Sequence, residues 1–256
     1  MKIATTVAAF LCFVQSSLAA PAAEPGAHIE RRALATVYSS CKHANTVALT
    51  FDDGPYIYET DIVSLLNSNG IKGTFFVNGN NYDCIYDQRQ VTSLKNAFNS
   101  GHMIGSHTWA HLDLSAQSWD KIHDEMWRVE QAMQKILGVT PNFMRPPYGN
   151  YNDLVRSASS IRNQSLVIWD FDSGDSLGHT ATQSKNDYQA LINKHPNNIL
   201  PLNHETVQTT STSVLPFIIP KLKAAGYKFD TVAGCLGLSP YHSVGQAGTR
   251  DSTWHC

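Results

Sequence analysis

The 256-residue sequence lacks a strong excess of charge of either sign. Charged side chains make up 16% of the residues, and the formal net charge is −2. This composition gives no electrostatic reason to expect binding to nucleic acid or to an anionic membrane. Beyond residue 20 the sequence also lacks an apolar run long enough to cross a bilayer, and it contains no internal repeat. Hydrophobic residues make up 42% of the chain, which predicts a globular, soluble monomer with one sizeable core.

The one notable apolar run lies at the start of the chain. Lys2 precedes a short apolar stretch at residues 3–14, and small residues follow at the spacing that a signal peptidase recognises. We therefore expect residues 1–19 to be a signal peptide and the protein to be secreted. Residues 20–32 end in a dibasic pair and are interpreted either as a propeptide or as a disordered linker. The predicted folded domain is 33–256.

Cysteine is scarce as well. One of the five falls in the predicted signal peptide, and the others are Cys41, Cys84, Cys235 and Cys256. None has zinc-ribbon spacing, so an even set in an oxidising compartment predicts two disulfides. Of the three possible pairings we favour Cys41–Cys235 and Cys84–Cys256. Cys41 precedes the first predicted strand and Cys235 follows the last, and those two ends are neighbours in a closed barrel.

Compact apolar runs alternate with helical patterns along the predicted domain. We expect about seven strands, near residues 47–49, 74–77, 103–106, 142–144, 166–171, 199–202 and 227–232. Helices are expected near 58–69, 91–99, 115–137, 154–161, 188–192 and 214–225. Such alternation predicts an α/β fold with a parallel sheet, and the number of units in one domain favours a closed barrel over an open sheet.

Three local signals refine this pattern. Ser115 is expected to be the N-cap of the longest helix. Pro201 removes a ladder hydrogen bond from its strand, which predicts a distortion there. The Gly- and Ser-rich tail, residues 238–256, is expected to wrap the outside of the domain and to be held by its terminal cysteine.

Two adjacent acids stand at the centre of the candidate site. Residues 50–55 read Thr-Phe-Asp-Asp-Gly-Pro and follow a predicted buried strand. Asp-Gly-Pro can be turn sequence alone. However, Asp52 and Asp53 crowd like charges together, which calls for a cation or a proton. Both acids can serve one site only if the strand ends there, because neighbours in a regular strand point to opposite faces.

A matched pair of histidines supplies the second part of the site. His107 and His111 are four residues apart, and this spacing places both imidazoles on one face of a helical turn. Two neutral imidazoles and one carboxylate, here Asp53, form a metal site that leaves positions open for water and substrate. The other histidines are not assigned a role.

Further polar clusters follow other predicted strands, at residues 145–149, residues 172–175 and His204. The carboxyl ends of barrel strands converge on one mouth. We therefore expect these clusters to join the acids and the histidine pair in a single constellation.

Taken in order, these segments resemble the motifs of the polysaccharide deacetylase family, the carbohydrate esterases typified by chitin deacetylases. The resemblance extends over residues 47–232. It implies a distorted (β/α)7 barrel in a single domain at 33–256. It also implies a hydrolase that removes N-acetyl groups from the N-acetylglucosamine residues of chitin or its oligosaccharides and releases acetate. Asp53, His107 and His111 would then bind the metal, usually zinc, with cobalt or another divalent cation as the alternative.

The resemblance assigns further roles. It implies catalytic functions for Asp52, His204, Arg145 and Asp175 and substrate contacts from Tyr148, Leu202 and Pro147. Asp52 would be the general base and His204 the general acid. Arg145 would orient the base, and Asp175 would hold His204 or Arg145 by its charge. The backbone N–H of Tyr148 would help to hold the oxyanion, and Leu202 would line the pocket for the acetyl methyl group.

The sequence departs from the family pattern at one position. The family often has a tryptophan after the second aspartate of the motif at residues 172–175, whereas this sequence has Ser176. The aromatic wall that this tryptophan supplies is missing here, which bears on the shape of the acetyl pocket and on substrate preference.

Other functions remain as alternatives. Acetylated xylan and peptidoglycan are substrates for the same machinery, although the signal, the propeptide and the single glycosylation acceptor at Asn163 look like those of secreted fungal chitin deacetylases. A glycosidase would need two carboxylates across the sugar bond, and a non-haem iron oxygenase would use the same ligand set with an oxidising cosubstrate. A non-enzymatic carbohydrate-binding protein on this scaffold would be favoured by loss of Asp52 or His204, and both are present.

Overall fold

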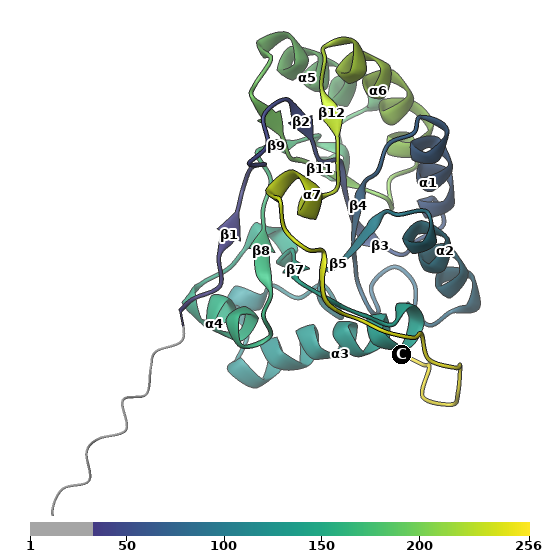
Figure 1. Ribbon diagram of the computed structural model, residues 1–256, viewed down its shortest axis with the longest axis vertical. Helices are drawn as coiled ribbons and strands as arrows, with labels where there is room; N and C mark the ends of the chain where they lie inside the picture. The colour runs from purple at the N-terminus through teal and green to yellow at the C-terminus, as the bar shows by residue number, and fades with distance from the viewer. Residues whose placement is uncertain (1–32) are drawn as a thin grey trace, which may run out of the picture. The chain divides into compact units, whose positions relative to one another are not determined.

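The computed structural model describes residues 33–256, which belong to one compact unit (Figure 1). The predicted signal peptide at 1–19 and the possible propeptide at 20–32 lie outside the described residues. Within 33–256, no helix has both the length and the apolar surface required to span a bilayer.

A curled sheet of eight strands forms the centre of the domain. In spatial order its strands are β1 (Val37–Tyr38), β8 (Ser165–Val167), β7 (Phe143–Met144), β5 (Met103–Ser106), β4 (Thr74–Val77), β3 (Thr50–Gly54), β11 (Pro201–His204) and β9 (Phe171–Asp172). All neighbours in this sheet are parallel. A second parallel sheet consists of β10 (Asn198–Ile199), β2 (Thr46–Val47) and β12 (Lys228–Phe229). Along the chain, β2 comes just before β3, and β10 comes just before β11.

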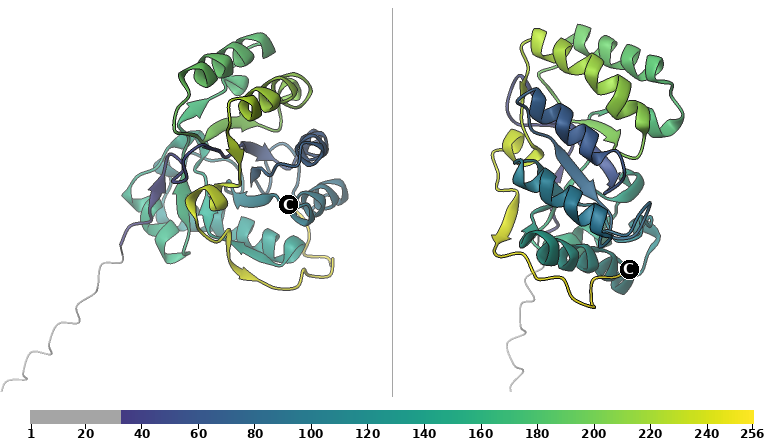
Figure 2. Two further views of the ribbon diagram at one scale, coloured as in Figure 1. Left: turned by 45° about the horizontal axis from the view of Figure 1, so that its top comes forward. Right: turned by 90° about the vertical axis from the view of Figure 1, so that its right-hand side faces the viewer.

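Helices cover the outer face of the curled sheet (Figure 2). They are α1 (Glu59–Ser68), α2 (Gln88–Asn99), α3 (Trp119–Leu137), α4 (Asp153–Ile161), α5 (Ala181–Lys194) and α6 (Leu215–Ala224). The short α7 (Val232–Leu236) packs instead in a separate hydrophobic cluster with Phe76 and Val167 of the sheet. Consecutive helices pack against one another from α1 to α4, and α5 packs against α6. This arrangement confirms the expected distorted (β/α)7 barrel.

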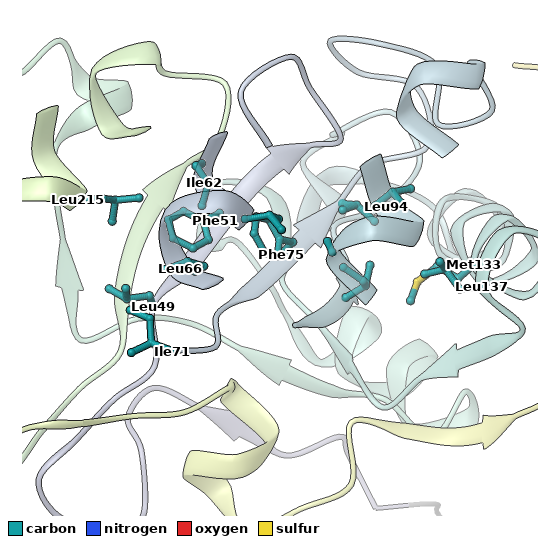
Figure 3. Packing of buried hydrophobic residues seen from close by; sticks show 14 of the residues in the cluster. Leu49, Phe51, Ile62, Leu66, Ile71, Phe75, Leu94, Met133, Leu137 and Leu215 are labelled. Atoms are coloured by element: carbon teal, nitrogen blue, oxygen red, sulfur yellow. The ribbon is translucent and has the colours of Figure 1, made fainter. Parts of the chain in front are cut away.

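The main hydrophobic core lies between the sheet and the helices (Figure 3). In β3 and β4, Phe51 and Phe75 point outward, with ring centroids 5.1 Å apart, and belong to the same core cluster as Ile62 and Leu66 of α1. Because side chains alternate along a strand, burying Phe51 on the helix side directs its neighbour Asp52 toward the inside of the barrel.

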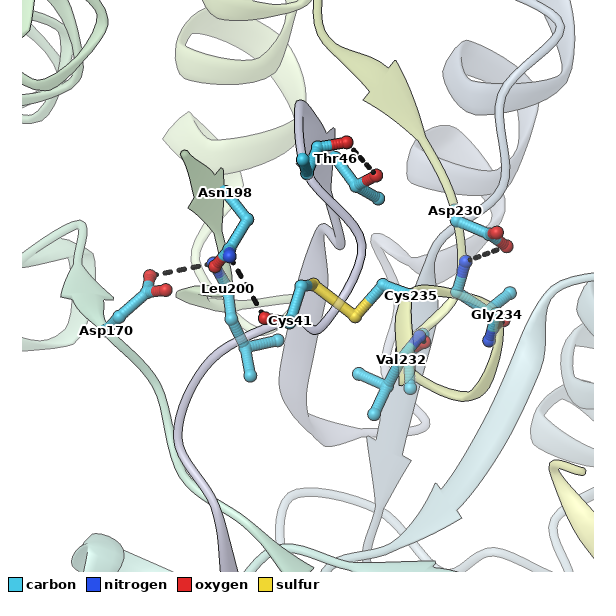
Figure 4. The surroundings of a disulfide bond; sticks show 12 residues. Cys41, Thr46, Asp170, Asn198, Leu200, Asp230, Val232, Gly234 and Cys235 are labelled. Atoms are coloured by element: carbon cyan, nitrogen blue, oxygen red, sulfur yellow. Dashed lines mark hydrogen bonds between the residues drawn. A yellow bond between two sulfur atoms is a disulfide. The ribbon is translucent and has the colours of Figure 1, made fainter. Parts of the chain in front are cut away.

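The sheet is curled but open, since β1 and β9 are its two end strands. The predicted strand 166–171 is interrupted and contributes β8 on one side and β9 on the other. The distortion expected at Pro201 is also present: the ladder breaks at Leu200 between β10 and β11. The Asp170 carboxylate accepts the Leu200 N–H at 2.7 Å (Figure 4), so the buried amide is satisfied although the strand is broken.

Other boundaries differ from the sequence expectations. The acids lie within β3, whereas the sequence suggested that they follow the strand. The longest helix begins at Trp119, and its N-cap is Ser118, whose Oγ accepts the Lys121 N–H. Ser115 lies in a separate 3-10 turn, Leu114–Ala116. The predicted N-cap at Ser115 was therefore wrong by one short turn.

The two disulfides pair as predicted, Cys41 with Cys235 (Figure 4) and Cys84 with Cys256. The first joins the segment before β2 to α7, although the barrel is not closed there. The second holds the end of the tail. Part of that tail forms β13 (Tyr241–Val244), which pairs with β6 (Val139–Pro141) in an antiparallel ladder, so the tail runs along the outside of the domain as expected.

Candidate active site

A distortion in β3 allows adjacent acids to face the same place. The pairing of β3 with β4 shifts by one residue between Asp52 and Gly54, and Asp53 adopts a positive φ of 72°. Such a bulge redirects a side chain that regular alternation would send to the other face. As a result, Asp52 Oδ2 and Asp53 Oδ1 lie 3.7 and 3.6 Å from His107 Nε2. The strand continues past the acids, and the bulge provides the turning that the sequence analysis attributed to a strand end.

Asp53, His107 and His111 form a cluster whose ligand atoms all lie within 4.8 Å of one another. His111 Nε2 is 3.2 Å from Asp53 Oδ1. His107 Nδ1 is 2.7 Å from the Arg145 carbonyl oxygen, which fixes the proton on Nδ1 and directs the Nε2 lone pair toward Asp53. Burial lowers the pKa of His107 to about 3, against the opposing charge of Asp53. A neutral imidazole with this orientation fits a metal ligand.

The two histidines lie on a loop after β5, which corrects the expected helical turn. Thr108 and His111 have positive φ values of 71° and 53°. Hydrogen bonds from distant elements hold the loop: Asn78 Nδ2 donates to the Thr108 carbonyl at 3.0 Å, and buried Glu125 accepts the Ala110 N–H at 2.7 Å. The loop therefore brings the imidazoles together without helical geometry.

Arg145 fixes the position of Asp52, the acid outside the three-residue cluster. Its Nη1 donates to Asp52 Oδ1 at 2.8 Å and to Thr50 Oγ1 at 2.6 Å. Nε and Nη2 donate to the carbonyl oxygens of Val167 and Ile168, each at 3.2 Å. Burial raises the pKa of Asp52 above its ordinary value, and the charge and hydrogen bond of Arg145 oppose that rise. Asp52 therefore has one oxygen fixed by Arg145 and the other directed toward His107.

His204 stands opposite Asp52 on the neighbouring strand, because the two residues are register partners in the β11–β3 ladder. Its Nδ1 is 2.7 Å from Asp175 Oδ1, while Asp175 Oδ2 accepts the His204 N–H at 2.8 Å and the Thr210 hydroxyl at 2.7 Å. Burial by itself would lower the pKa of His204. The hydrogen bond and the charge of Asp175 outweigh it and raise this pKa to about 9. His204 is consequently protonated at neutral pH.

A cavity of about 380 Å³ opens between these groups. Its lining residues are Asp53, His111, Tyr148, Trp169, Asp172, Ser176, Leu177, Leu202 and His204. Tyr148 has a positive φ of 61°, and its ring lies 4.7 Å from that of His111. Pro147 is buried and does not line the cavity. Of the three predicted substrate contacts, Tyr148 and Leu202 therefore reach the cavity and Pro147 does not.

Trp169 and Asn81 are among the residues at the site that escaped the sequence analysis. Trp169 lines the cavity and lies 5.6 Å from the Arg145 guanidinium, so an aromatic wall is present although position 176 is serine. The only signal for it was its place near the carboxyl end of a predicted strand. Asn81 Nδ2 donates to Asp53 Oδ1 at 3.4 Å, and no pattern in the sequence pointed to that contact.

Comparison with known proteins agrees with this geometry. The sequence profile of the polysaccharide deacetylase family matches residues 39–163. A chitin deacetylase of Pestalotiopsis sp is 36% identical over 208 residues, covering 79% of this chain and 67% of the relative. One from Colletotrichum lindemuthianum is 32% identical over 207 residues, covering 78% and 83%. The solved structure of the chitin deacetylase from Colletotrichum lindemuthianum matches with a TM-score of 0.76 at 29% identity, covering 81% of this chain and 94% of that one. The chain therefore belongs to the polysaccharide deacetylase family of enzymes.

Proposed function

We propose that this protein is a secreted, zinc-dependent hydrolase that removes N-acetyl groups from N-acetylglucosamine residues of chitin or chitin oligosaccharides. The observation that carries the proposal is the arrangement around the cavity. The cluster of Asp53, His107 and His111 lies beside the Arg145-bound Asp52, and the protonated His204 lies opposite. The cation site and the acid thus line one cavity, and the base lies directly beside the cation site.

Asp53, His107 and His111 would hold the cation, because two imidazole nitrogens and one carboxylate are a donor set that zinc accepts with a coordination position left open. A divalent cation supplies Lewis acidity, which polarises an acyl oxygen and makes water more acidic. Cobalt or another divalent cation could take the same ligands. Preference for zinc is supported by the two imidazoles and by the neutral state of His107.

Asp52 would act as the general base. Its free oxygen accepts a proton from the attacking water, while Arg145 holds the other oxygen and fixes the direction of the carboxylate. The same guanidinium is buried and bound to two carbonyl oxygens, so it cannot turn away. Arg145 therefore acts by orienting Asp52 and stays outside the proton transfer.

The positive φ of Tyr148 turns its backbone relative to the neighbouring 3-10 residues. The amides of the next two residues, Gly149 and Asn150, donate to the carbonyl oxygens of Pro146 and Pro147, and Tyr148 itself lines the cavity. We assign the Tyr148 N–H to the oxyanion that forms when water adds to the acetyl carbonyl. Leu202 and Trp169 would contact the acetyl methyl group.

His204 would donate the proton that the departing sugar amine requires. Asp175 keeps the imidazole charged and holds Nδ1, which leaves Nε2 as the donor. Acid and base thus come from neighbouring strands, since His204 and Asp52 are register partners, and each has a carboxylate or guanidinium partner that fixes its protonation state.

Secretion and the chitin substrate rest on separate support. The two disulfides are consistent with an oxidising compartment. The two relatives described above are chitin deacetylases. Acetylxylan esterase and peptidoglycan deacetylase activities would use the same groups, and a binding protein would retain the cavity without turnover.

Acetate release from three substrates separates these functions. Purified protein with zinc added would be incubated in parallel with N-acetylglucosamine oligomers, acetylated xylan and peptidoglycan. We expect acetate from the chitin oligomers. Release only from xylan or only from peptidoglycan would reassign the substrate. No release from any of them, with zinc shown to be bound, would favour the binding protein.

A further inference from the structure

Two carboxyl groups lie fully buried behind the catalytic strands and take no part in the chemistry proposed above. Glu59 is the first residue of α1, and Glu205 directly follows β11. Both side chains are shielded from solvent, and neither lines the cavity. Two ionised carboxylates cannot be buried side by side without a partner, because burial and mutual repulsion both oppose it.

The contacts of this pair leave one oxygen free on each side chain. Ser93 Oγ donates to Glu59 Oε1 at 2.9 Å, and the Tyr56 N–H donates to Glu205 Oε1 at 2.8 Å. The turn brings the two side chains near each other, because the Glu59 N–H donates to the Tyr56 carbonyl oxygen at 3.2 Å while the Tyr56 N–H binds Glu205. Both Oε2 atoms are buried and have no hydrogen-bond partner among the described residues. A proton on one carboxyl group would satisfy both Oε2 atoms through a single hydrogen bond between them.

The electrostatics agree with this geometry. Burial raises the pKa of Glu59 to about 7, and the hydrogen bonds from Ser93 and Glu205 limit that rise. Burial and the charge of Glu59 raise the pKa of Glu205 well above its ordinary value, and the Asp53 carboxylate adds to the repulsion. These shifts favour a proton on Glu205, because burial and the charges of its neighbours both raise the pKa of that group.

Glu205 binds the chain on both sides of the turn that follows Asp52. The Glu205 N–H donates to the Asp52 carbonyl oxygen at 3.2 Å, and its carboxyl group binds the Tyr56 N–H. Between these two attachments lie Asp53, Gly54 and Pro55. The Glu205 carboxyl group also fills the space beside Gly54, where a Cβ would come within 2.1 Å of it. The position of the Asp53 backbone is thus bounded on both sides by contacts with one residue.

We propose that Glu59 and Glu205 form a proton-sharing carboxylic acid–carboxylate pair that acts as a positioning device for Asp53 through residues 54–56. Neither glutamate touches the reacting atoms, so both are positioning residues. The inference rests on the proposed function, because it assigns the pair to the placement of a metal ligand.

Three variants test the proposal. Glu205→Gln replaces the acid proton with an amide N–H and keeps an acceptor for Tyr56. We therefore expect it to bind zinc as the wild type does. Glu205→Asp shortens the side chain so that it cannot reach Tyr56 and Glu59 together, and we expect zinc affinity to fall about tenfold or more, as for other partners of metal ligands. Ser93→Ala is the matched control: it removes a contact of Glu59 and leaves the turn in place, and it should bind zinc normally.

Two readouts that require no turnover decide the result. Zinc affinity is measured by competition with a chelating dye, after thermal unfolding has shown that each variant is folded. Infrared difference spectra of the metal-free protein at pH 8 should show a protonated carboxyl band in the wild type that is missing from Glu205→Gln. The absence of this band would overturn the shared proton. Wild-type zinc affinity in a folded Glu205→Asp variant, or equal losses in Glu205→Asp and Glu205→Gln, would overturn the positioning role.

These outcomes stay separate from a failure of the proposed function. If the wild type binds zinc but releases no acetate from any substrate, the proposed function fails. The zinc affinities and the infrared band still decide whether the glutamate pair positions Asp53.

Discussion

At the scale of single residues, the two adjacent aspartates differ in their partners. Arg145 Nη1 donates to Asp52 and also to Thr50. Asp53, in contrast, faces the two imidazoles. The grouping of Asp53 with the histidine pair was predicted from residue types at the ends of predicted strands, whereas the general-base role of Asp52 is what the family resemblance implies. The means of directing both to one site could not be predicted, since a positive φ at Asp53 is unusual for a residue other than glycine.

Substitution of Asp52 separates the two roles. We predict that Asp52→Asn binds zinc with wild-type affinity, because the residue is not among the three ligands, while kcat falls by about 10²- to 10⁴-fold through loss of the base. His107→Ala should lose both zinc and activity. Zinc content and acetate release are measured on the same samples. Substantial turnover by Asp52→Asn would contradict the general-base assignment.

The raised pKa of His204 predicts a pH dependence of activity. The proton donor is present while His204 is charged, so activity should decline as the pH rises through about 9. Asp175→Asn removes the main stabilising charge and should move this decline to lower pH. The pH profiles of kcat for the two proteins measure the shift. An unchanged alkaline limb in Asp175→Asn would contradict the role of the pair.

The His204 imidazole also contributes to folding stability, and linkage gives the direction in which this contribution changes with pH. The pKa of His204 is raised above its ordinary value on folding, so the folded state binds the proton more tightly. Its contribution is fully present below pH about 6.5 and is lost as the pH rises through about 9. Urea unfolding between pH 6 and pH 10 should therefore show a loss of stability in the wild type that is much smaller in His204→Gln.

At the scale of elements, short apolar strands with clear ends could be predicted best. β4 and β5 have the expected boundaries, residues 74–77 and 103–106. The histidine loop could not be predicted, because a spacing of four residues fits both a helical turn and a loop. Contacts from Asn78 and Glu125, which no local pattern reveals, select the loop.

The β3 turn gives a prediction for an element. Gly54→Ala should place a methyl group against the Glu205 carboxyl group. Overpacking of this kind costs about 1–3 kcal/mol, and it should also weaken zinc binding through Asp53. Gly245→Ala is the control, since its nearest neighbour would be 3.8 Å away. Thermal unfolding with and without zinc compares the two variants, and equal melting temperatures would count against the tight packing at Gly54.

At the scale of the whole molecule, the fold class and both disulfide pairings could be predicted from the order of the elements. The open seam of the sheet could not, because alternation along the chain does not say which strands pair last. Cys41 and Cys235 connect the segments before β2 and after β12, at the amino end of the strands, away from the cavity. Because this disulfide lies away from the cavity, we expect it to stabilise the fold without affecting the site.

Removal of this disulfide tests that expectation. We predict that the double variant Cys41→Ala, Cys235→Ala loses about 2–5 kcal/mol of stability and keeps wild-type kcat/KM at temperatures where it is folded. Unfolding curves and acetate release give the two quantities. A large loss of kcat/KM in the folded variant would show that the cross-link also shapes the cavity.

The central claim is that Asp53, His107 and His111 hold a cation that the deacetylation requires. The most direct measurement is acetate release from N-acetylglucosamine oligomers by one protein sample, before chelation, after chelation and after zinc is added back. The account predicts release, loss and recovery, in step with the bound zinc. Undiminished release from the chelated protein would contradict it, as would no release from protein with zinc bound.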